Sequence, residues 1–341
     1  MKEIATVPTS LPESNQRKGP YSVKNGKDIT RHEKNGVISD FKYDLKHHKS
    51  LLAMNIPTIV FFLIFAYLPM FGIIIAFQNF NPVDGIFHSK FVGFDNFKFF
   101  LGSTACMRVI FNTLFLNALF ILSSMIISIL IALMLSEVAN RLFKRVSQSV
   151  VILPHFISWT VVALLLEAFL SSKTGFLNKA LTSFGLPEIS FYSSPTVWPA
   201  LLTVIKIWQG AGFGSIVYLA AITGIDQEIY EAARIDGASR WQCILRITLP
   251  LLKPTAILLL LMDVGKIFNG DFGMIYAIVG NNTLLYPTTD VIDTYIYRQL
   301  MELGDMGMSS AVGLLQSVLG FVMVYATNWI ARKLEPESAI F

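Results

Sequence analysis

Charged residues are scarce in this sequence of 341 residues. Only 15% are Asp, Glu, Lys or Arg, where soluble domains carry about 25%. Hydrophobic residues make up 53% of the chain, and its mean hydropathy is +0.56. This balance excludes an ordinary soluble domain and indicates a membrane protein. The formal net charge of +4 is too small to indicate nucleic-acid binding.

Cysteine and the other common metal ligands are also scarce. The two cysteines, Cys106 and Cys243, are predicted on opposite sides of the membrane by the topology below, so they cannot pair with each other. No CxxC motif or His/Cys cluster with metal-ligand spacing occurs, and the five histidines are scattered. Ser215, in a GFGS stretch, lacks a histidine partner. We therefore expect no metal site, no catalytic residue and no enzyme activity in this chain.

The first 50 residues lack the apolar periodicity of a folded segment. They are rich in Asn, Ser, Pro, Lys and Glu, so we expect a largely disordered tail over residues 1–50, with a short helix near FKYDLKHHKS. The first apolar block begins late and is too long for the hydrophobic region of a cleaved signal peptide. We expect this block to remain as a membrane span.

Long apolar runs dominate the rest of the chain. A transmembrane helix needs about 20 mostly apolar residues. Six segments satisfy this requirement: 51–77, 109–135, 150–170, 197–223, 251–280 and 308–330. The predicted fold is an all-α integral membrane protein, with a six-span domain over residues 51–335 and a short cytoplasmic tail over residues 336–341.

The orientation follows from the Lys and Arg residues near the span ends, because cytoplasmic loops carry an excess of them. One side has five or six: Lys90, Lys98, Lys173, Lys179 and Arg298, with Arg108 at a boundary. The other side has twelve: Lys42, Lys46, Lys49, Arg141, Lys144, Arg145, Arg234, Arg240, Arg246, Lys253, Arg332 and Lys333. Both termini are therefore predicted to be cytoplasmic.

A polar stretch, DQEIYEAARIDGASRWQCILRITLPLLKP, separates spans four and five on the cytoplasmic side. Asp226 is a suitable N-cap for a helix that runs through Asp236, and Gly237 is a suitable left-handed C-cap. The small residues Ala232, Ala233 and Gly237 favour close packing. From the residues alone, the packing partner is either the chain's own bundle or a groove on another protein.

A second helix is predicted after this turn. Ser239 and Gln242 have the spacing of a capping box that starts it. Pro250 and Pro254 are expected to end it and to lead into span five. Its mostly apolar face would contain Trp241, Ile244, Leu245 and Thr248.

The stretch resembles the EAA loop of bacterial ATP-binding-cassette importer permeases. The match extends over every fixed position: Glu231-Ala232-Ala233, Gly237 and Ile247-Thr248-Leu249-Pro250. The stretches FVGFDNF, LPHFISW and DVIDTYIYR are similar to the carbohydrate-uptake branch, in particular to permeases for complex oligosaccharides. The resemblance covers the chain from about residue 50 to its end, with the loop at residues 224–250.

This resemblance implies a type I importer permease in the bacterial plasma membrane. The expected partners are a second, related permease in a heterodimer, two ATPase subunits, an extracytoplasmic solute-binding protein, an oligosaccharide and membrane lipid, without nucleic acid. This chain would bind no cofactor, since ATP and Mg would belong to the ATPase subunits. The absence of a GxxxxGK[ST] motif agrees with this. The implied ATPase-docking residues are Glu231, Ala232, Ala233, Asp236, Gly237, Ile247, Leu249 and Pro250.

Polar residues within spans four and five are candidates for the substrate path, because they are costly in lipid and usually face a cavity or a partner helix. Gly210 and Gly214 have GxxxG spacing, which we assign to helix packing. Asp263 and Lys266 are three residues apart and favour a structural ion pair. The substrate-path candidates are Trp208, Gln209, Asn269, Asp271 and Phe272.

A proton-coupled secondary sugar transporter is the alternative function. Asp263, Lys266, Asp271 or Glu167 would then be the relay groups. That class predicts inverted repeats, and the sequence shows no clear internal repeat. It also leaves the EAA pattern as a coincidence.

Overall fold

The computed structural model describes residues 49–172 and 174–334. The expectations for the N-terminal tail and for residues 336–341 lie outside these ranges, apart from the last residues of the tail. The chain divides into two compact units, one ending at Met70 and the other beginning at Phe71. Each unit is described by itself.

The first unit contains the start of an apolar span. Helix α2 (Lys49–Phe62) continues into a π-helical turn, η2 (Leu63–Tyr67). The 3-10 helix η3 (Leu68–Phe77) then crosses into the second unit. The segment Ala53–Phe77 is long and apolar enough to cross a membrane, which confirms the predicted first span.

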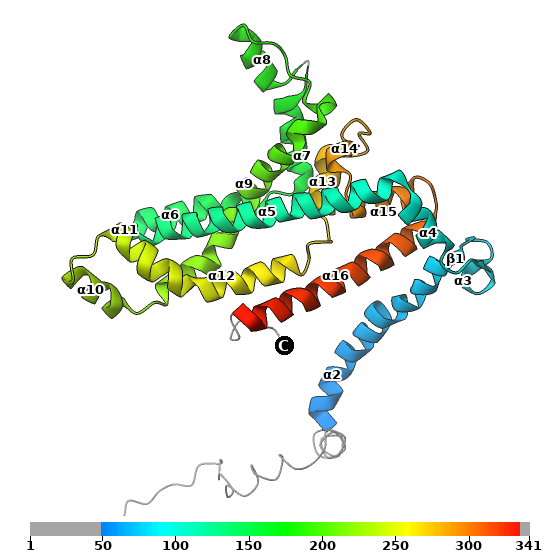
Figure 1. The fold of residues 1–341 in the computed structure, drawn as a ribbon, viewed down its shortest axis with the longest axis horizontal. Coiled ribbons are helices and arrows are strands. Elements are labelled where there is room, and N and C mark those ends of the chain that lie inside the picture. Colours follow the sequence, from blue (N-terminus) through cyan, green and yellow to red (C-terminus); the bar gives the residue numbers. More distant parts are fainter. Residues whose placement is uncertain (1–48, 173, 335–341) are drawn as a thin grey trace, which may run out of the picture. The chain divides into compact units, whose positions relative to one another are not determined.

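The second unit contains the other candidate spans (Figure 1). Helices α5 (Thr104–Ser136) and α9 (Trp198–Thr223) pack against each other, and α16 (Met306–Leu334) packs against α12 (Leu249–Val264). The third span is bent: α6 (Arg141–Ile152) and η4 (Leu153–Phe156) meet α7 (Trp159–Leu170) at 92°. The described residues thus contain five candidate membrane spans, or six if the two bent helices together count as one span.

The helix after the polar stretch runs on into span five. Helix α11 (Arg240–Cys243), the π-helical turn η7 (Ile244–Thr248) and α12 form one membrane-length segment. The expectation that Pro250 and Pro254 end this helix is therefore wrong. Pro250 lies in the first turn of α12, directly after η7, where the π-helical turn rearranges the hydrogen bonds that a proline would otherwise break.

Span five does not extend to residue 280 as one helix. Helix α12 ends at Val264, residues 265–271 form an irregular segment, and α13 (Phe272–Val279) follows. The side chain of Asp271 starts α13 by accepting a hydrogen bond from the backbone N–H of Met274 at 3.1 Å. Within a membrane, the N–H and C=O groups of such irregular backbone need hydrogen-bond partners from protein or water, because lipid offers none.

Close packing between helices depends on two glycines of α9. A Cβ at Gly212 would lie 2.0 Å from the backbone oxygen of Val151, and one at Gly214 would lie 2.7 Å from Oγ of Ser128. A Cβ at Gly210 would meet nothing within 4 Å. The predicted GxxxG contact is therefore right for Gly214 and wrong for Gly210, because about one helical turn from Gly214 no atom of a neighbouring helix comes within 4 Å of this Cβ.

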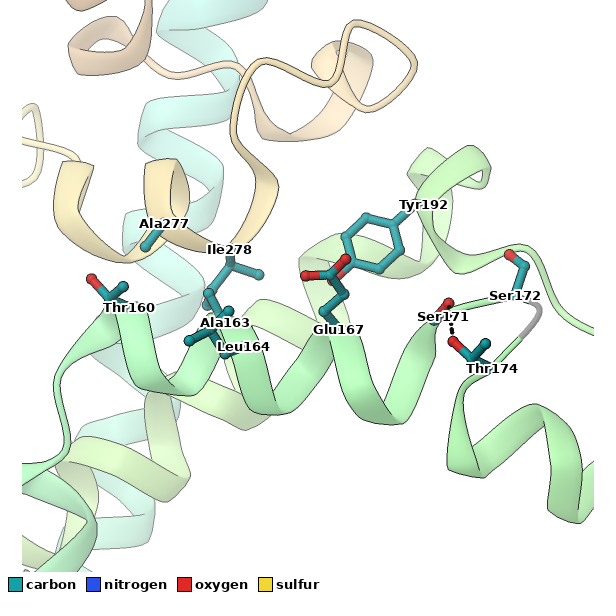
Figure 2. Close-up of a pocket in the computed structure, with 10 residues that line it drawn as sticks. All are labelled: Thr160, Ala163, Leu164, Glu167, Ser171, Ser172, Thr174, Tyr192, Ala277 and Ile278. Carbon is teal, nitrogen blue, oxygen red and sulfur yellow. Dashed lines mark hydrogen bonds between the residues drawn. The ribbon is translucent and has the colours of Figure 1, made fainter.

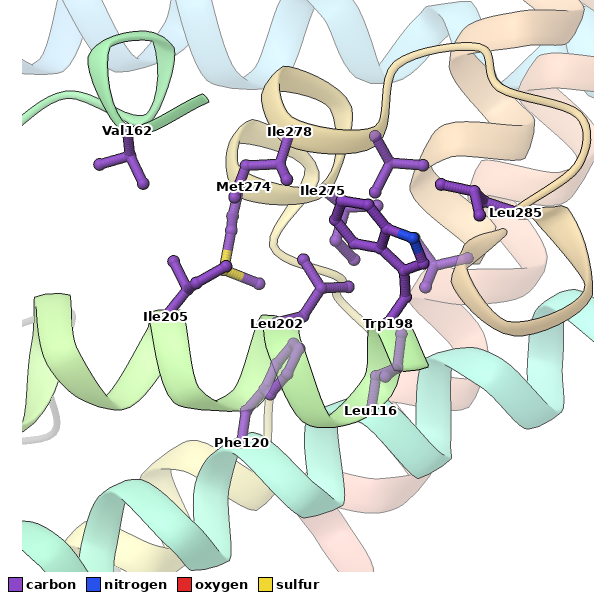
Figure 3. Packing of buried hydrophobic residues seen from close by; sticks show 12 residues of the cluster. Leu116, Phe120, Val162, Trp198, Leu202, Ile205, Met274, Ile275, Ile278 and Leu285 are labelled. Carbon is purple, nitrogen blue, oxygen red and sulfur yellow. The ribbon is translucent and has the colours of Figure 1, made fainter. Parts of the chain in front are cut away.

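A buried apolar cluster joins α5, α7, α9 and α13 (Figure 3). Trp198 is fully buried in it and donates its indole N–H to the backbone oxygen of Phe191 at 2.9 Å. Because lipid is as apolar as these side chains, the cluster is stabilised by close packing rather than by transfer from water. The other buried members include Leu116, Phe120, Val162, Leu202, Ile205, Met274, Ile275 and Ile278.

Short elements occupy the other connections between the long helices. Strands β1 (Gln78–Asn79) and β2 (Lys90–Phe91) pair antiparallel around α3 (Gly85–His88), and α4 (Asp95–Gly102) follows them. Helix α8 (Phe176–Ser183) and the 3-10 turns η5 (Phe191–Ser193) and η6 (Pro195–Val197) lie between α7 and α9. Helices α14 (Tyr286–Thr289) and α15 (Ile292–Met301) lead into α16.

Candidate functional site

The EAA-like loop folds as the sequence predicts. Helix α10 (Gln227–Ile235) is capped by Asp226, whose carboxylate accepts a hydrogen bond from the N–H of Glu228 at 3.0 Å. Gly237 ends it with φ +82°, a left-handed conformation that favours glycine. The capping box between Ser239 and Gln242 is present in both directions. The loop is therefore a fixed helix–turn–helix rather than a flexible connection.

One side-chain bridge connects α10 to the membrane helix behind it. The hydroxyls of Tyr230 and Thr248 lie 2.9 Å apart, and Thr248 also donates to the backbone oxygen of Cys243 at 3.4 Å. Thr248 is buried at the end of η7, immediately before α12. A displacement of α10 would thus be passed on to the start of α12.

Most of the predicted docking residues lie on an accessible surface. Glu231, Ala232, Asp236, Gly237 and Pro250 are exposed, and Ala233 and Ile247 are half-buried. A shallow groove of about 320 Å³ runs between the turn and η7; it is lined by Ala233, Asp236, Gly237, Ala238, Gln242, Arg246 and Ile247. Leu249 differs, because it packs against the buried cluster between α5, α9 and α12.

Two apolar side chains protrude beside these residues. Ile235 is 86% exposed and Trp241 is 72% exposed. Exposed large apolar groups next to small residues are typical of a protein-binding surface. The docking role of the loop stays a prediction at this point.

A polar cavity of about 400 Å³ lies beside the irregular segment of span five. It brings together two of the predicted path residues, Asn269 and Asp271, with Lys206 from α9. It also contains Asn117 and Ser124 of α5, which the sequence analysis did not select. Their signal was the spacing of seven residues between them, which places both polar side chains on one face of a mostly apolar span. The remaining lining residues are Phe120, Ile121, Asp263, Lys266 and Gly270.

The ion pair in this cavity differs from the expected one. Nζ of Lys206 lies 2.6 Å from Oδ2 of Asp271, which connects α9 to the start of α13. Asp263 and Lys266 both line the cavity, but they make no ion pair in the described chain; the backbone N–H of Lys266 donates to the backbone oxygen of Asp263 at 3.0 Å. The helix ends between them, so the helical i, i+3 geometry that the expectation assumed is lost.

Three other predicted path residues lie elsewhere. Trp208 is 45% exposed and borders a small apolar cavity between α7 and α9. Gln209 is buried, and its amide donates to the backbone oxygen of His155 at 3.4 Å. Phe272 stacks on Tyr276, with ring centroids 5.1 Å apart. None of the three is among the residues that line the 400 Å³ cavity.

Side chains from distant helices hold the irregular segment in place. The amide of Asn117 donates to the backbone oxygens of Ile267 at 2.8 Å and Asn269 at 3.3 Å. The amide of Gln316 donates to the backbone oxygen of Phe268 at 2.8 Å. These contacts satisfy carbonyl groups that the broken helix leaves unpaired.

Asp293 of α15 also holds this segment, but here the backbone donates the hydrogen bond and the side chain accepts it. Its Oδ2 accepts from the backbone N–H of Gly270 at 2.6 Å, and the Gln316 amide donates to both carboxylate oxygens, at 3.1 and 3.2 Å. Burial raises the pKa of Asp293, and the hydrogen bonds from Gln316 and Gly270 oppose this rise. A Cβ at Gly270 would lie 2.7 Å from Oδ2, so only glycine fits this approach.

A buried carboxylate organises the segment before α15. Asp290 is 1% exposed and pairs with Arg108 at 3.0 Å and with Arg298 at 2.9 Å. The Asp290 carboxylate raises the pKa of Arg298, although burial acts in the opposite direction. The DVIDTYIYR stretch therefore provides both this ion-pair cluster and the Asp293 contact.

A family model described as the binding-protein-dependent transport system inner membrane component matches residues 124–336. LplB of Bacillus subtilis (strain 168) is 38% identical over 293 residues, which cover 86% of this chain and 92% of LplB. The polygalacturonan/rhamnogalacturonan transport system permease protein YteP of the same organism is 35% identical over 293 residues, covering 86% of this chain and 91% of YteP.

Solved structures of a bacterial transporter are similar in both sequence and fold. One comes from an ATP-binding-cassette transporter involved in the import of the acidic polysaccharide alginate; it has a TM-score of 0.79 and 39% identity, and covers 87% of this chain and 99% of that chain. Another is an alginate transporter in complex with alginate pentasaccharide-bound periplasmic protein, with a TM-score of 0.77 and 38% identity; it covers 88% of this chain and 98% of that chain.

Proposed function

Because the chain belongs to the family of binding-protein-dependent transport system inner membrane components, we propose that it is the permease subunit of an ATP-binding-cassette importer that passes an oligosaccharide across the membrane. The observation that carries this proposal is the 400 Å³ cavity beside the broken span five. Family membership accounts for the EAA pattern, which the proton-coupled alternative leaves as a coincidence.

The chemistry of the cavity suits a saccharide. The ammonium groups of Lys206 and Lys266 donate hydrogen bonds, and the side chains of Asp263 and Asn269 accept them. Phe120 adds an apolar face against which the C–H groups of a sugar ring can pack. The two lysines and two aspartates balance in charge, so the cavity has no strong preference for ions of one sign.

The names of the relatives guide the choice of sugars to test. YteP is named for polygalacturonan and rhamnogalacturonan, and the similar solved structures for alginate. Oligosaccharides of these polymers are therefore the first substrates to screen for this chain.

Energy would come from separate ATPase subunits that dock on α10. The proposal is supported by the exposed Glu231, Ala232 and Gly237, by the apolar side chains beside them, and by the Tyr230–Thr248 bridge to α12. ATP and Mg would bind to those subunits, and this chain would hold no cofactor.

The remaining partners follow from the same arrangement. Asp263 and Lys266 are exposed at the cavity in the single chain, so a second permease would complete the wall of the path. The loop end would face the cytoplasm, with both termini on that side of the bacterial inner membrane. The solute-binding protein would deliver the sugar at the opposite end, where α4, α8 and α14 lie.

The direct test is ATP hydrolysis in liposomes that contain this chain with its permease, ATPase and binding-protein partners. We expect loaded binding protein to stimulate hydrolysis and Gly237→Asp to abolish the stimulation. An Asp side chain at this position disfavours the left-handed turn, at about 1–2 kcal/mol, and adds a charge to the docking surface.

Gly304→Asp is the matched control for this variant. Gly304 also has positive φ, +67°, and open surroundings, but it lies between α15 and α16, at the other end of the spans. The docking assignment fails if Gly237→Asp keeps its sugar-stimulated hydrolysis, or if Gly304→Asp lowers co-purification of the ATPase subunits as much as Gly237→Asp does.

A further inference from the structure

A second cavity, of about 660 Å³, lies along α7 (Figure 2). Ala163 and Leu164 of α7 and Ala277 and Ile278 of α13 form its apolar side. Its polar side chains are Thr160, Glu167, Ser171, Ser172, Thr174 and Tyr192. An aromatic ring, a carboxylate and several hydroxyl groups therefore face one space.

Glu167 stands out in this cavity because it lies in a helix that is otherwise almost wholly apolar. Its carboxylate makes no hydrogen bond or ion pair within the described chain. The carboxylate is exposed in the single chain and lies in the last turn of α7, so it is accessible to a ligand in the cavity. Figure 2 shows the carboxylate directed toward the ring of Tyr192. Burial and the nearby Glu167 carboxylate both raise the pKa of Tyr192.

Helices α7 and α13 pack against each other and bring the second cavity near the first, which is itself lined by α5, α9, the end of α12 and residues 266–271. Asp271, just before α13, lines the first cavity, and Ala277 lines the second, so they are about 9 Å apart along a helix axis. On the α7 side, Trp159 lies 5.6 Å from Nζ of Lys206, and the next residue, Thr160, already lines the second cavity.

We propose that the second cavity is a saccharide subsite, which binds one ring of a longer oligosaccharide while the first cavity holds a ring further along the same saccharide. The proposal rests on the oligosaccharide import proposed above. The Glu167 carboxylate accepts hydrogen bonds from ring hydroxyls, and Tyr192 offers its ring to the C–H face of the sugar.

The test uses uptake by the complete transporter in liposomes, with rhamnogalacturonan-derived disaccharide and tetrasaccharide as probes. The two probes differ in length, and the proposal requires the longer one to reach both cavities and the shorter one to bind in the first cavity alone. Glu167→Gln and Tyr192→Phe keep the side-chain shapes. For Glu167→Gln we expect KM for the tetrasaccharide to rise about tenfold, as for the loss of one hydrogen bond to a charged group. For the disaccharide, we expect KM to stay within about a factor of two.

Glu188→Gln is the matched control, because Glu188 is exposed in the segment after α8 and lines neither cavity. A second readout uses Glu167→Cys in a chain whose buried Cys106 and Cys243 are replaced by alanine. The tetrasaccharide should slow methanethiosulfonate labelling of this cysteine more than the disaccharide does.

Each outcome supports or overturns the subsite. The subsite is overturned if Glu167→Gln changes KM equally for both saccharides or not at all, and if neither saccharide slows labelling of the cysteine at position 167. The importer function would still stand in that case. Failure of the wild-type transporter to take up either saccharide overturns the proposed substrate class and, with it, the subsite.

Discussion

Replacing Gly270 by alanine probes how the wall of the 400 Å³ cavity is held. The new Cβ would lie 2.7 Å from Oδ2 of Asp293 and 3.1 Å from Cγ2 of Val291. The carboxylate must then move, which breaks its 2.6 Å hydrogen bond to the Gly270 N–H. Overpacking and an unsatisfied N–H together cost about 2–5 kcal/mol, with the local structure of residues 265–271 affected first.

The expected result is a loss of substrate affinity with intact assembly. If the substitution destabilises the arrangement of Asn269 and Asp271 that binds substrate by about 2 kcal/mol, the apparent KM for uptake rises about thirtyfold. ATPase association, measured by co-purification, should not change, because α10 lies at the far end of α12. Gly320→Ala is the control, since a Cβ there meets nothing within 4 Å. Wild-type KM in Gly270→Ala would refute the argument that Asp293 and Gly270 shape the cavity.

Two other substitutions test the coupling path and the buried ion-pair cluster. Tyr230→Phe removes the hydroxyl contact to Thr248, which costs about 0.5–1.5 kcal/mol. Binding-protein-stimulated ATP hydrolysis should therefore fall while basal hydrolysis persists. Equal losses of both activities would contradict a coupling role. Asp290→Asn leaves two partly buried arginines without their carboxylate and should destabilise the chain by about 3–5 kcal/mol, measured as thermal aggregation in detergent. Asp305→Asn, at the exposed start of α16, should aggregate at the wild-type temperature.

Much of the fold was predictable because it depends on local rules. The length of the apolar runs identified the spans, and the residues around Asp226, Gly237 and Ser239 identified the caps of the EAA-like loop. The errors arose where a local rule was extended too far. Pro250 was treated as a helix end because the π-helical turn before it leaves no mark in the pattern of apolar residues. The bend between α6 and α7 was likewise hidden inside one apolar run.

The candidate site was only partly predictable. Asn269 and Asp271 were selected because polar residues in a span are costly, and both line the cavity. Trp208 and Phe272 were selected by the same reasoning but face other surroundings. Glu167 was assigned only as an alternative proton relay, although it lies in the larger cavity. Residue type indicates that a polar group needs a partner, but not which partner it finds.

The sequence by itself determined that this chain is an all-α membrane protein with five or six candidate spans and a structured EAA-like loop, because hydrophobic length and capping act over a few residues. Only the tertiary structure decided which polar groups share a cavity. The irregular segment before α13 is held by Asn117, Asp293 and Gln316, which come from three different helices. The physical reason is that lipid offers no hydrogen bonds, so each backbone group of a broken span must find a partner within the fold. These partners lie up to about 150 residues away in the chain.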